Sequence, residues 1–282
     1  MSGTGPKAGG RDYLEAFLAP IAERAALAMC GDTPIAVAPQ MAADDTSAPT
    51  LGTAQAPTWP LALVCGDARS AATRATRLAA TLGTEAGDDR GAWLDKLTKA
   101  LPDLAQMRDV PEVTHAIAGQ ETHEHRAFGR GPTVILAARP RPGPTGLAHL
   151  VAALATGAPT LVVALSDSAA AWQVVVDAAQ TAGVPSSGIA MVTAQTRAEA
   201  AAWALVPSLA TWVIDGPRTP WSGLLGEALH RRRLSAVALP HVWCTLEGPS
   251  LGAPRALLRR HLLVRTVAVN TMRHGAPLSL ES

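Results

Sequence analysis

Short apolar runs alternate with longer amphipathic stretches from residue 133 onward. Apolar runs of about four to eight residues are typical of buried strands, and apolar positions spaced three or four residues apart are typical of helices. The runs predict strands at 133–138, 161–165, 189–192 and 210–214, with 234–239 as a further candidate. The stretches between them predict helices at 145–155, 168–181, 197–205 and 221–230. Apolar strands alternating with helices favour a parallel sheet covered on both faces, so we expect an α/β fold with a Rossmann-like sheet.

The pattern on either side of this region is less regular. Upstream, it predicts a strand at 61–65 and helices at 67–82 and 92–107, and a β-branched run at 262–269 predicts a long terminal strand. Residues 11–30 have the spacing of an amphipathic helix that Pro20 bends, whereas residues 31–57 are rich in Ala, Pro, Thr and Gly. We therefore expect two parts, an N-terminal helix and arm over 1–57 and a Rossmann-like domain over 58–282.

Composition narrows the functional classes. The chain has 24 basic and 23 acidic residues, so no overall field favours nucleic acid or an anionic membrane. Nine arginines and three glutamates lie between residues 218 and 282, but no aromatic interleaving or recognition motif accompanies them. The three cysteines form no CxxC pair, which argues against a disulfide framework or a zinc site and indicates a reducing, cytoplasmic environment. Residues 142–166 carry no charge, but internal Gly-Pro and Gly-Ala-Pro turns argue against a membrane span.

Three clusters of polar residues are candidates for chemistry. His123 and His125 would face the same side of a strand, which suits a metal site, although a polar hairpin or strand edge is the favoured interpretation. Residues 231–233, all arginine, could contact an acidic partner or form a solvated helix end stabilised by the helix dipole. The loop at 140–144 lacks the glycine-rich turn of a phosphate cradle and is expected to be rigid. We expect Trp172, Trp203 and Trp212 to lie in the core.

Several segments, in this order, resemble the aldehyde dehydrogenase superfamily. Residues 155–163 (ATGAPTLVV) are similar to the family's A-x-G-N-T-V-V turn into a strand, and residues 182–189 (AGVPSSGI) resemble its A-G-[LV]-P-x-G-V segment with one residue inserted. Residues 206–217 contain VPSL and then WVIDGP, similar to H-P-x-[VI] followed by F-T-G-S. Residues 64–67 and 89–94 resemble the family's N-terminal strand–helix and E-R helix. The resemblance implies the coenzyme-binding half of such an enzyme.

The chain departs from the family where its function resides. The segment P-W-N-F-P corresponds to residues 138–142, so Pro140 replaces the asparagine that helps to hold the developing oxyanion. The lysine and glutamate of K-P-S-E become Ala164 and Asp167, and the serine of F-T-G-S becomes Pro217. The resemblance leaves Asp167 and Gly216 as vestigial cofactor-binding residues, because Asp167 can still accept hydrogen bonds from ribose hydroxyls. No cofactor is expected, and NAD(P) is the alternative.

The residues after Pro217 are too few to form the catalytic domain of the resembled family. Only 65 residues follow Pro217, too few for the domain that carries the nucleophilic cysteine. Cys244 and Glu247 invite assignment as nucleophile and base, but their surroundings do not match the family's G-Q-x-C loop. We therefore expect an incidental cysteine and no catalytic or metal-binding residue.

The tail resembles a terminal strand of the same superfamily. Residues 264–271 (VRTVAVNT) and 274–280 (HGAPLSL) are similar to the end of proline-utilisation flavoenzymes, whose longer members carry a non-catalytic aldehyde-dehydrogenase-like domain. In those relatives, and in double-domain aldehyde dehydrogenases, terminal strands support oligomerisation. The sequence predicts a non-catalytic assembly subunit, either a homo-oligomer or a complex with an active aldehyde dehydrogenase. The alternative is an NAD(P)-binding subunit of a heteromeric dehydrogenase that is active only with a partner chain.

Overall fold

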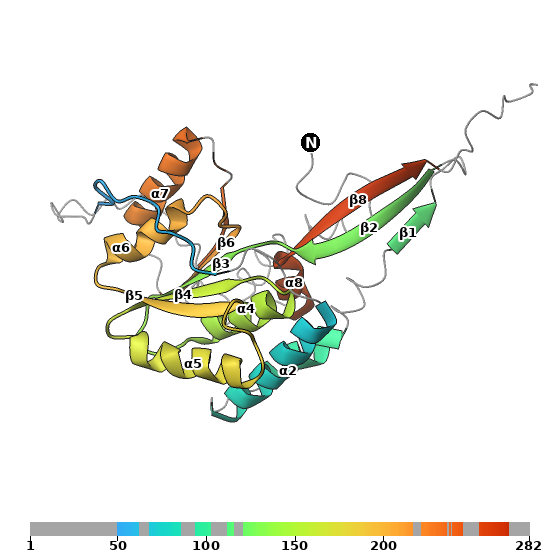
Figure 1. Ribbon diagram of the computed structural model, residues 1–282, viewed down its shortest axis with the longest axis horizontal. Coiled ribbons are helices and arrows are strands. Elements are labelled where there is room, and N and C mark those ends of the chain that lie inside the picture. Colours follow the sequence, from blue (N-terminus) through green and yellow to red (C-terminus); the bar gives the residue numbers. More distant parts are fainter. Residues whose placement is uncertain are drawn as a thin grey trace, which may run out of the picture.

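The protein folds into a parallel sheet flanked by helices and a separate antiparallel sheet (Figure 1). A computed structural model describes residues 50–61, 68–85, 94–102, 112–115, 121–216, 221–235, 237, 239–244 and 254–270. The predicted helix at 11–30, most of the arm and most of the predicted strand at 61–65 lie outside these residues.

The parallel sheet has five strands in the order β5-β4-β3-β6-β7, and each neighbouring pair is parallel. The strands are β3 (Thr133–Ala137), β4 (Thr160–Leu165), β5 (Ile189–Ala194), β6 (Thr211–Asp215) and β7 (His241–Cys244). β3 is central, and the chain adds strands on one side of it and then on the other. This order is the Rossmann arrangement that the alternation of apolar runs and helices predicted.

Helices cover both faces of this sheet. One face carries α2 (Ala68–Glu85), a helical segment at 94–102, α4 (Pro144–Ala155), α5 (Ala169–Thr181) and α8 (Pro254–Arg260). The opposite face carries α6 (Arg197–Ala202), the 3₁₀ turn η1 (Trp203–Leu205) and α7 (Ser222–Leu234). Alternate strand residues supply the two cores, so Ile135 packs with the first set of helices and Val134 with the second.

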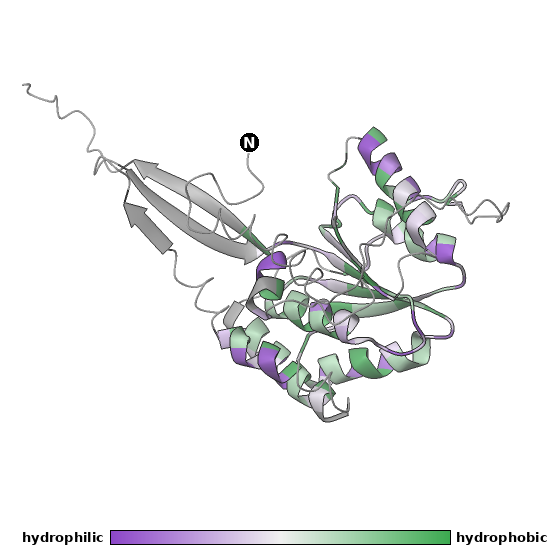
Figure 2. Ribbon diagram, turned by 180° about the vertical axis from the view of Figure 1, so that it is seen from behind, coloured by the Kyte–Doolittle hydropathy of each residue, from purple (hydrophilic) through white to green (hydrophobic). Residues whose placement is uncertain are grey.

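The buried elements are strongly apolar, as Figure 2 shows for α4 and the strands beneath it. All three tryptophans assigned to the core, Trp172, Trp203 and Trp212, are at most 8% exposed. None of the described helices combines the length and the apolar composition that crossing a bilayer requires.

One strand prediction was wrong. Leu234 is the last residue of α7, and the fifth strand begins at His241, so no strand covers 234–239 in the part of the chain that the structure describes. The side chain of Arg232 explains the longer helix, because it is 2% exposed and its guanidinium donates to four carbonyl oxygens. Those carbonyls belong to Ala204, Val206, Pro207 and Leu209. This long-range contact stabilises the last turn of α7 against an apolar pattern that favours a strand.

The neighbouring Arg231 is also used within the chain. Its guanidinium pairs with Glu227 one turn earlier and bonds to the carbonyl oxygens of Gly52 and Ala54. The N–H of Leu51 donates to the same Glu227 carboxylate at 2.8 Å, and Leu51 is 3% exposed. The Leu51 amide, followed by Arg231, holds the pKa of Glu227 below its usual value. The expectation of a solvated arginine cluster or an acidic partner surface is therefore wrong for the buried Arg232, whereas Arg231 is partly exposed and Arg233 is exposed.

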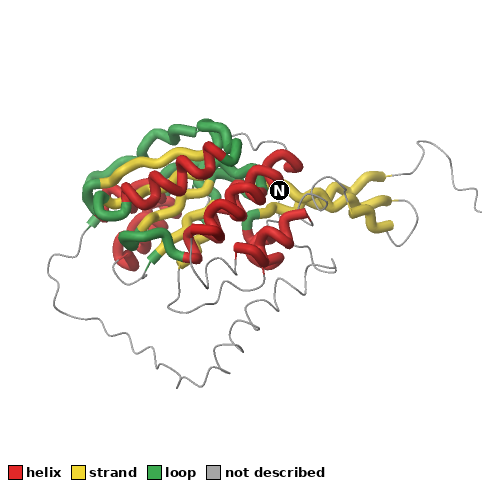
Figure 3. Tube along the Cα trace, turned by 90° about the horizontal axis from the view of Figure 1, so that it is seen from below, coloured by secondary structure: helices red, strands yellow, loops and turns green. Residues whose placement is uncertain are grey.

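The second sheet contains β1 (Glu112–His115), β2 (Glu121–Gly129) and β8 (Leu262–Asn270), in the order β1-β2-β8. Both neighbouring pairs are antiparallel, and β2 pairs with β8 along its whole length. The sheet extends away from the helices and the parallel sheet (Figures 1 and 3). The terminal strand is confirmed. His123 and His125 lie in a hairpin strand as predicted, but β2 is the central strand and not an edge.

A buried polar cluster attaches this sheet to the helices. The backbone N–H of Arg130 donates to the His261 carbonyl at 2.8 Å, and its side chain donates to the carbonyls of Arg260 and Leu262 at 2.8 and 3.0 Å. Nδ1 of His149, in α4, lies 2.9 Å from Nε2 of His261, and both rings are buried. Desolvation, followed by the charges of Arg130 and Arg260, lowers the pKa of His261 to about 3. Desolvation, followed by the nearby His261 and Arg260, lowers the pKa of His149 well below 6.5. The pair is therefore neutral at pH 7.

Candidate functional site

The strand order of the parallel sheet reverses at β3, which defines the place where a ligand is expected. β4 follows β3 on one side and β6 lies on the other, so the carboxyl ends of β3 and β6 are adjacent, with Ala137 opposite Asp215. In open parallel sheets, ligands bind in the crevice outside the carboxyl ends of the strands at such a switch point. The candidate site is therefore formed by the loop after β3, the loop after β4 and the end of β6.

Asp215 is the residue that dominates this position. It is the last residue of β6 and is 0% exposed. Its Oδ2 accepts from the N–H of Gly143 at 2.7 Å, and its Oδ1 accepts from the N–H of Gly146 at 3.2 Å. α4 begins at Pro144, so a carboxylate from 72 residues further along the chain caps the first turn of this helix. The negative charge lies at the positive end of the helix dipole, where it is stabilising.

Two glycines make room for this carboxylate. A Cβ on Gly143 would lie 2.6 Å from Oδ1 of Asp215, and a Cβ on Gly146 would lie 2.6 Å from its Cγ. Such distances are far inside van der Waals contact, so a larger residue at either position would displace the carboxylate. The side chain of Arg139 lies over the same turn, since its Nη1 would be 3.1 Å from a Cβ on Gly143. Sequence reasoning missed Asp215, although a charged residue directly after the apolar run at 212–214 was an available signal.

Of the two predicted cofactor-binding residues, Asp167 remains available to a ligand. It is exposed in the loop that follows β4, at the carboxyl end of the strand next to β3. The neighbouring Ser168 is buried, and its hydroxyl lies 3.2 Å from the carbonyl oxygen of Ala137 and 3.0 Å from that of Leu165. This serine ties the loop to the end of β3, which places Asp167 beside the switch point.

Gly216 has a packing role. A Cβ at this position would lie 2.8 Å from the Cβ of Ala138 and 3.0 Å from its carbonyl carbon and oxygen. The N–H of Ala138 donates to the carbonyl of Asp215 at 3.1 Å, which extends the pairing of β3 with β6 by one residue. The close approach of these two backbones explains a glycine at 216 without a ligand.

Of the remaining positions at which the chain differs from the resembled family, those that the structure describes lie in a loop, in the core and at the end of a strand. Pro140 is exposed in the loop after β3, where it offers no N–H to a ligand. Ala164 is 0% exposed and packs in the core beneath α4. Pro217 and Glu247 lie outside the described residues, whereas Cys244 is the last residue of β7. Among the side chains that the structure describes, no three His, Cys, Asp or Glu residues converge as a metal site would require.

These residues do not fit a dinucleotide bound in the usual Rossmann manner. There, the pyrophosphate lies at the N-terminus of the helix that follows the first strand, and backbone N–H groups bind it. In this chain that helix is α4, and the Asp215 carboxylate already accepts from two N–H groups at its N-terminus, those of Gly143 and Gly146. A phosphate at the same position would lose these donors and meet a buried like charge.

Comparisons with known proteins agree with the fold. No protein-family model matches the chain, and no curated protein matches its sequence. Among solved structures, an NAD-dependent aldehyde dehydrogenase from Sinorhizobium meliloti is similar with a TM-score of 0.53 at 13% identity, covering 65% of this chain and 38% of that chain. The chain shares its fold with part of an aldehyde dehydrogenase. An aldehyde dehydrogenase from Pseudomonas aeruginosa is similar with a TM-score of 0.52 at 17% identity, covering 65% of this chain and 39% of that chain.

The likeness spans only part of these enzymes. A benzaldehyde dehydrogenase from Corynebacterium glutamicum, with a TM-score of 0.51 at 13% identity, is matched over 64% of this chain and 42% of its own length. The chain thus spans about two fifths of the aldehyde dehydrogenases that it resembles. At these identities the likeness shows a shared fold, and a shared fold does not by itself imply a shared activity.

Proposed function

We propose that this chain is a non-catalytic structural subunit with an aldehyde dehydrogenase fold, which assembles with a second copy of itself or with an active aldehyde dehydrogenase. The observation that carries this proposal is the capping of α4 by the buried carboxylate of Asp215. This internal contact takes the donors that a Rossmann fold offers to a coenzyme pyrophosphate. It gives the switch point a structural role in place of a ligand-binding one.

The antiparallel sheet supplies the surface for assembly. Within the described residues, β8 pairs with β2 along one edge, and its other edge faces no described strand. β8 has nine residues, which corresponds to an edge of about 30 Å at the usual rise of a strand. A long unpaired edge is a template for strand addition from another chain.

Coenzyme titration tests the first half of the proposal. We expect no heat when NAD or NADP is added to the purified chain in a calorimeter, because Asp215 already accepts from the Gly143 and Gly146 amides at the start of α4. An active aldehyde dehydrogenase titrated in the same buffer provides the positive control. Saturable binding of either coenzyme by the isolated chain would refute the non-binding role of the switch point.

A pair of proline variants tests the second half. Successive residues of a strand direct their N–H groups to opposite edges, so Val267→Pro and Ala268→Pro remove one donor that faces β2 and one that faces outward. Thermal unfolding identifies the variant that keeps the internal pairing with β2. In native mass spectrometry that variant should lose the assembly formed by the wild type. An unchanged assembly in both variants would show that β8 is not the interface.

Exposed Asp167 favours a second candidate function, an NAD(P)-binding subunit of a heteromeric dehydrogenase. A carboxylate at the carboxyl end of the second strand is well placed to accept hydrogen bonds from ribose hydroxyls. Under this alternative, NAD would bind only in the presence of the partner chain, and Asp167→Ala would weaken that binding about tenfold or more. If the mixture of the two chains binds coenzyme equally well with wild-type Asp167 and with Asp167→Ala, this second function is contradicted.

A further inference from the structure

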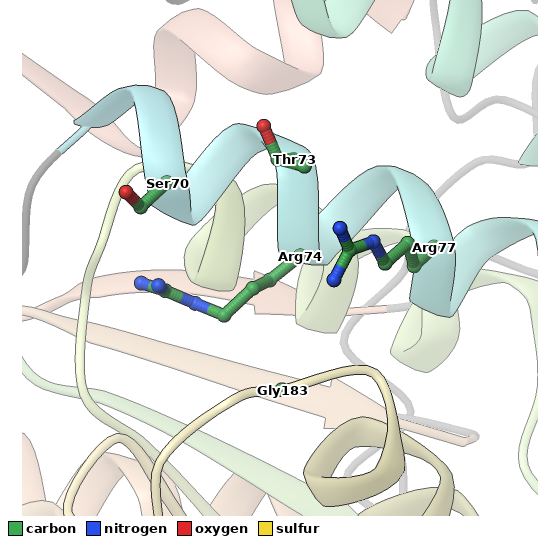
Figure 4. A pocket seen from close by; sticks show the side chains of 5 residues that line it. All are labelled: Ser70, Thr73, Arg74, Arg77 and Gly183. Atoms are coloured by element: carbon green, nitrogen blue, oxygen red, sulfur yellow. The ribbon is translucent and has the colours of Figure 1, made fainter.

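A groove lies between α2 and the turn that follows α5. It has a volume of about 470 Å³ and is lined by Ser70, Thr73, Arg74, Arg77 and Gly183 (Figure 4). Gly183 lies between the end of α5 and the start of β5, so the groove is near the amino ends of the parallel strands. The switch point is at their carboxyl ends, and the two sites are therefore independent.

The helical spacing of α2 places four polar residues along this groove. Residues 70, 73, 74 and 77 are separated by three or four positions, which brings them to one side of the helix. The opposite side of α2 is buried and consists of alanine and leucine, for example Ala75 and Leu78 at 0% exposure. The arginines are therefore not required for the packing of α2 against α4 and α5.

Neither arginine has an anionic neighbour in the described structure. No aspartate or glutamate lines the groove, and no described residue forms an ion pair or hydrogen bond with the side chain of Arg74 or Arg77. Arg74 is partly buried and Arg77 is exposed. Guanidinium groups remain charged at all physiological pH values, so the groove holds two positive charges that no described protein carboxylate balances.

The turn after α5 leaves space beside these charges. Gly183 has a φ of +94°, and the N–H of Val184 donates to the carbonyl of Ala179, as in a glycine-terminated helix end. A Cβ on Gly183 would lie 3.6 Å from Cδ of Arg74, so the aliphatic part of the arginine side chain lies next to the glycine. Figure 4 shows the side chain of Arg74 in the space between α2 and this turn, and the side chain of Arg77 running along α2 toward Arg74. The absence of a side chain at 183 keeps that space open.

We propose that this groove binds a phosphate monoester of a small metabolite. Guanidinium groups match the geometry and charge of a phosphate, and Arg74 and Arg77 line this groove together with Ser70 and Thr73. The volume of about 470 Å³ falls in the usual range of small-molecule sites and exceeds the needs of a single inorganic anion. Nucleic-acid surfaces need a longer array of cations than the two present here.

Titration with ribose 5-phosphate and with inorganic phosphate tests this site, with backbone NMR shifts as the readout at constant ionic strength. We expect ribose 5-phosphate to bind more tightly than inorganic phosphate and to shift resonances of residues 70–77 and 183. The double variant Arg74→Gln/Arg77→Gln should weaken binding of ribose 5-phosphate at least tenfold. The matched control is Arg233→Gln, which removes an exposed arginine from the opposite face of the sheet and should leave the affinity unchanged.

Three results would overturn the proposal. The first is that ribose 5-phosphate at about 10 mM shifts no NMR resonance, because the affinity would then be weaker than millimolar. The second is binding that the double arginine variant does not weaken, or that Arg233→Gln weakens equally. The third is equal affinity for inorganic phosphate and ribose 5-phosphate, because the groove would then bind only a free anion. Circular dichroism of each variant verifies that the fold is intact, and none of these results depends on the proposed assembly role.

Discussion

The capping of α4 by Asp215 leads to the most discriminating prediction. The change is Asp215→Ala, which removes the acceptor for the Gly143 and Gly146 amides. Loss of a helix N-cap costs about 1–2 kcal/mol, and a buried amide left without a partner costs about 1–3 kcal/mol. These terms overlap, so we expect Asp215→Ala to lower the free energy of unfolding by about 2–4 kcal/mol.

A second variant separates charge from shape. Asp215→Asn retains one carbonyl oxygen, but its NH₂ group must face one of the two backbone donors. It should therefore lose about 1–2 kcal/mol, roughly half of the effect of the alanine variant, because one neutral hydrogen bond survives. Urea unfolding followed by circular dichroism measures all three proteins. Asp177→Ala is the control, because Asp177 is exposed and bonds only to Gln173 among the described contacts, so its loss should cost less than about 0.5 kcal/mol.

Rescue by a small anion tests the mechanism directly. Formate has the carboxylate that Asp215→Ala removes, and it can occupy the space left beside the α4 amides. We expect about 100 mM formate to restore part of the lost stability of this variant, with no comparable effect on the wild type, because only the variant has the vacated site. Sodium chloride at the same ionic strength controls for screening. A stability within about 0.5 kcal/mol of the wild type for Asp215→Ala would refute the capping role of this residue.

Three further predictions concern the remaining buried polar contacts. The pKa values of His149 and His261 are lower in the folded than in the unfolded protein, so the free energy of unfolding should fall as pH decreases from about 6.5 toward about 3. His261→Gln should reduce the slope of this pH dependence by up to about 1.36 kcal/mol per pH unit, measured by urea unfolding from pH 4.5 to 7.5. Arg232→Met should destabilise the chain by about 3 kcal/mol or more, because the buried carbonyls lose their donor, and a variant of unchanged stability would contradict the assigned contacts. Gly146→Ala should destabilise the chain by about 1–3 kcal/mol despite the better helix propensity of alanine, because its Cβ would clash with Asp215. Gly226→Ala, on the exposed face of α7, clashes with nothing and should stabilise the chain by up to about 1 kcal/mol.

Local pattern accounts for most of the fold. Four of the five parallel strands and the helices between them lie where the apolar runs and amphipathic stretches predict them, within a few residues at each end. These elements were predictable because burial on both faces makes strands such as Val134–Leu136 continuously apolar, and the βα alternation allows few arrangements. The fifth strand was misplaced because the side chain of Arg232 keeps Leu234 in the helix.

The sequence by itself determined the fold class, the elements and the positions where the chain departs from the enzymes that it resembles. Only the tertiary structure decided the role of Asp215, because the amides that it caps are separated from it by 72 and 69 residues. The same holds for the pairing of His149 with His261, which are 112 residues apart. Hydrophobic periodicity is a property of neighbouring residues and is visible in the chain, whereas a polar group acquires its partner only when packing brings distant backbone and side chains within hydrogen-bonding distance.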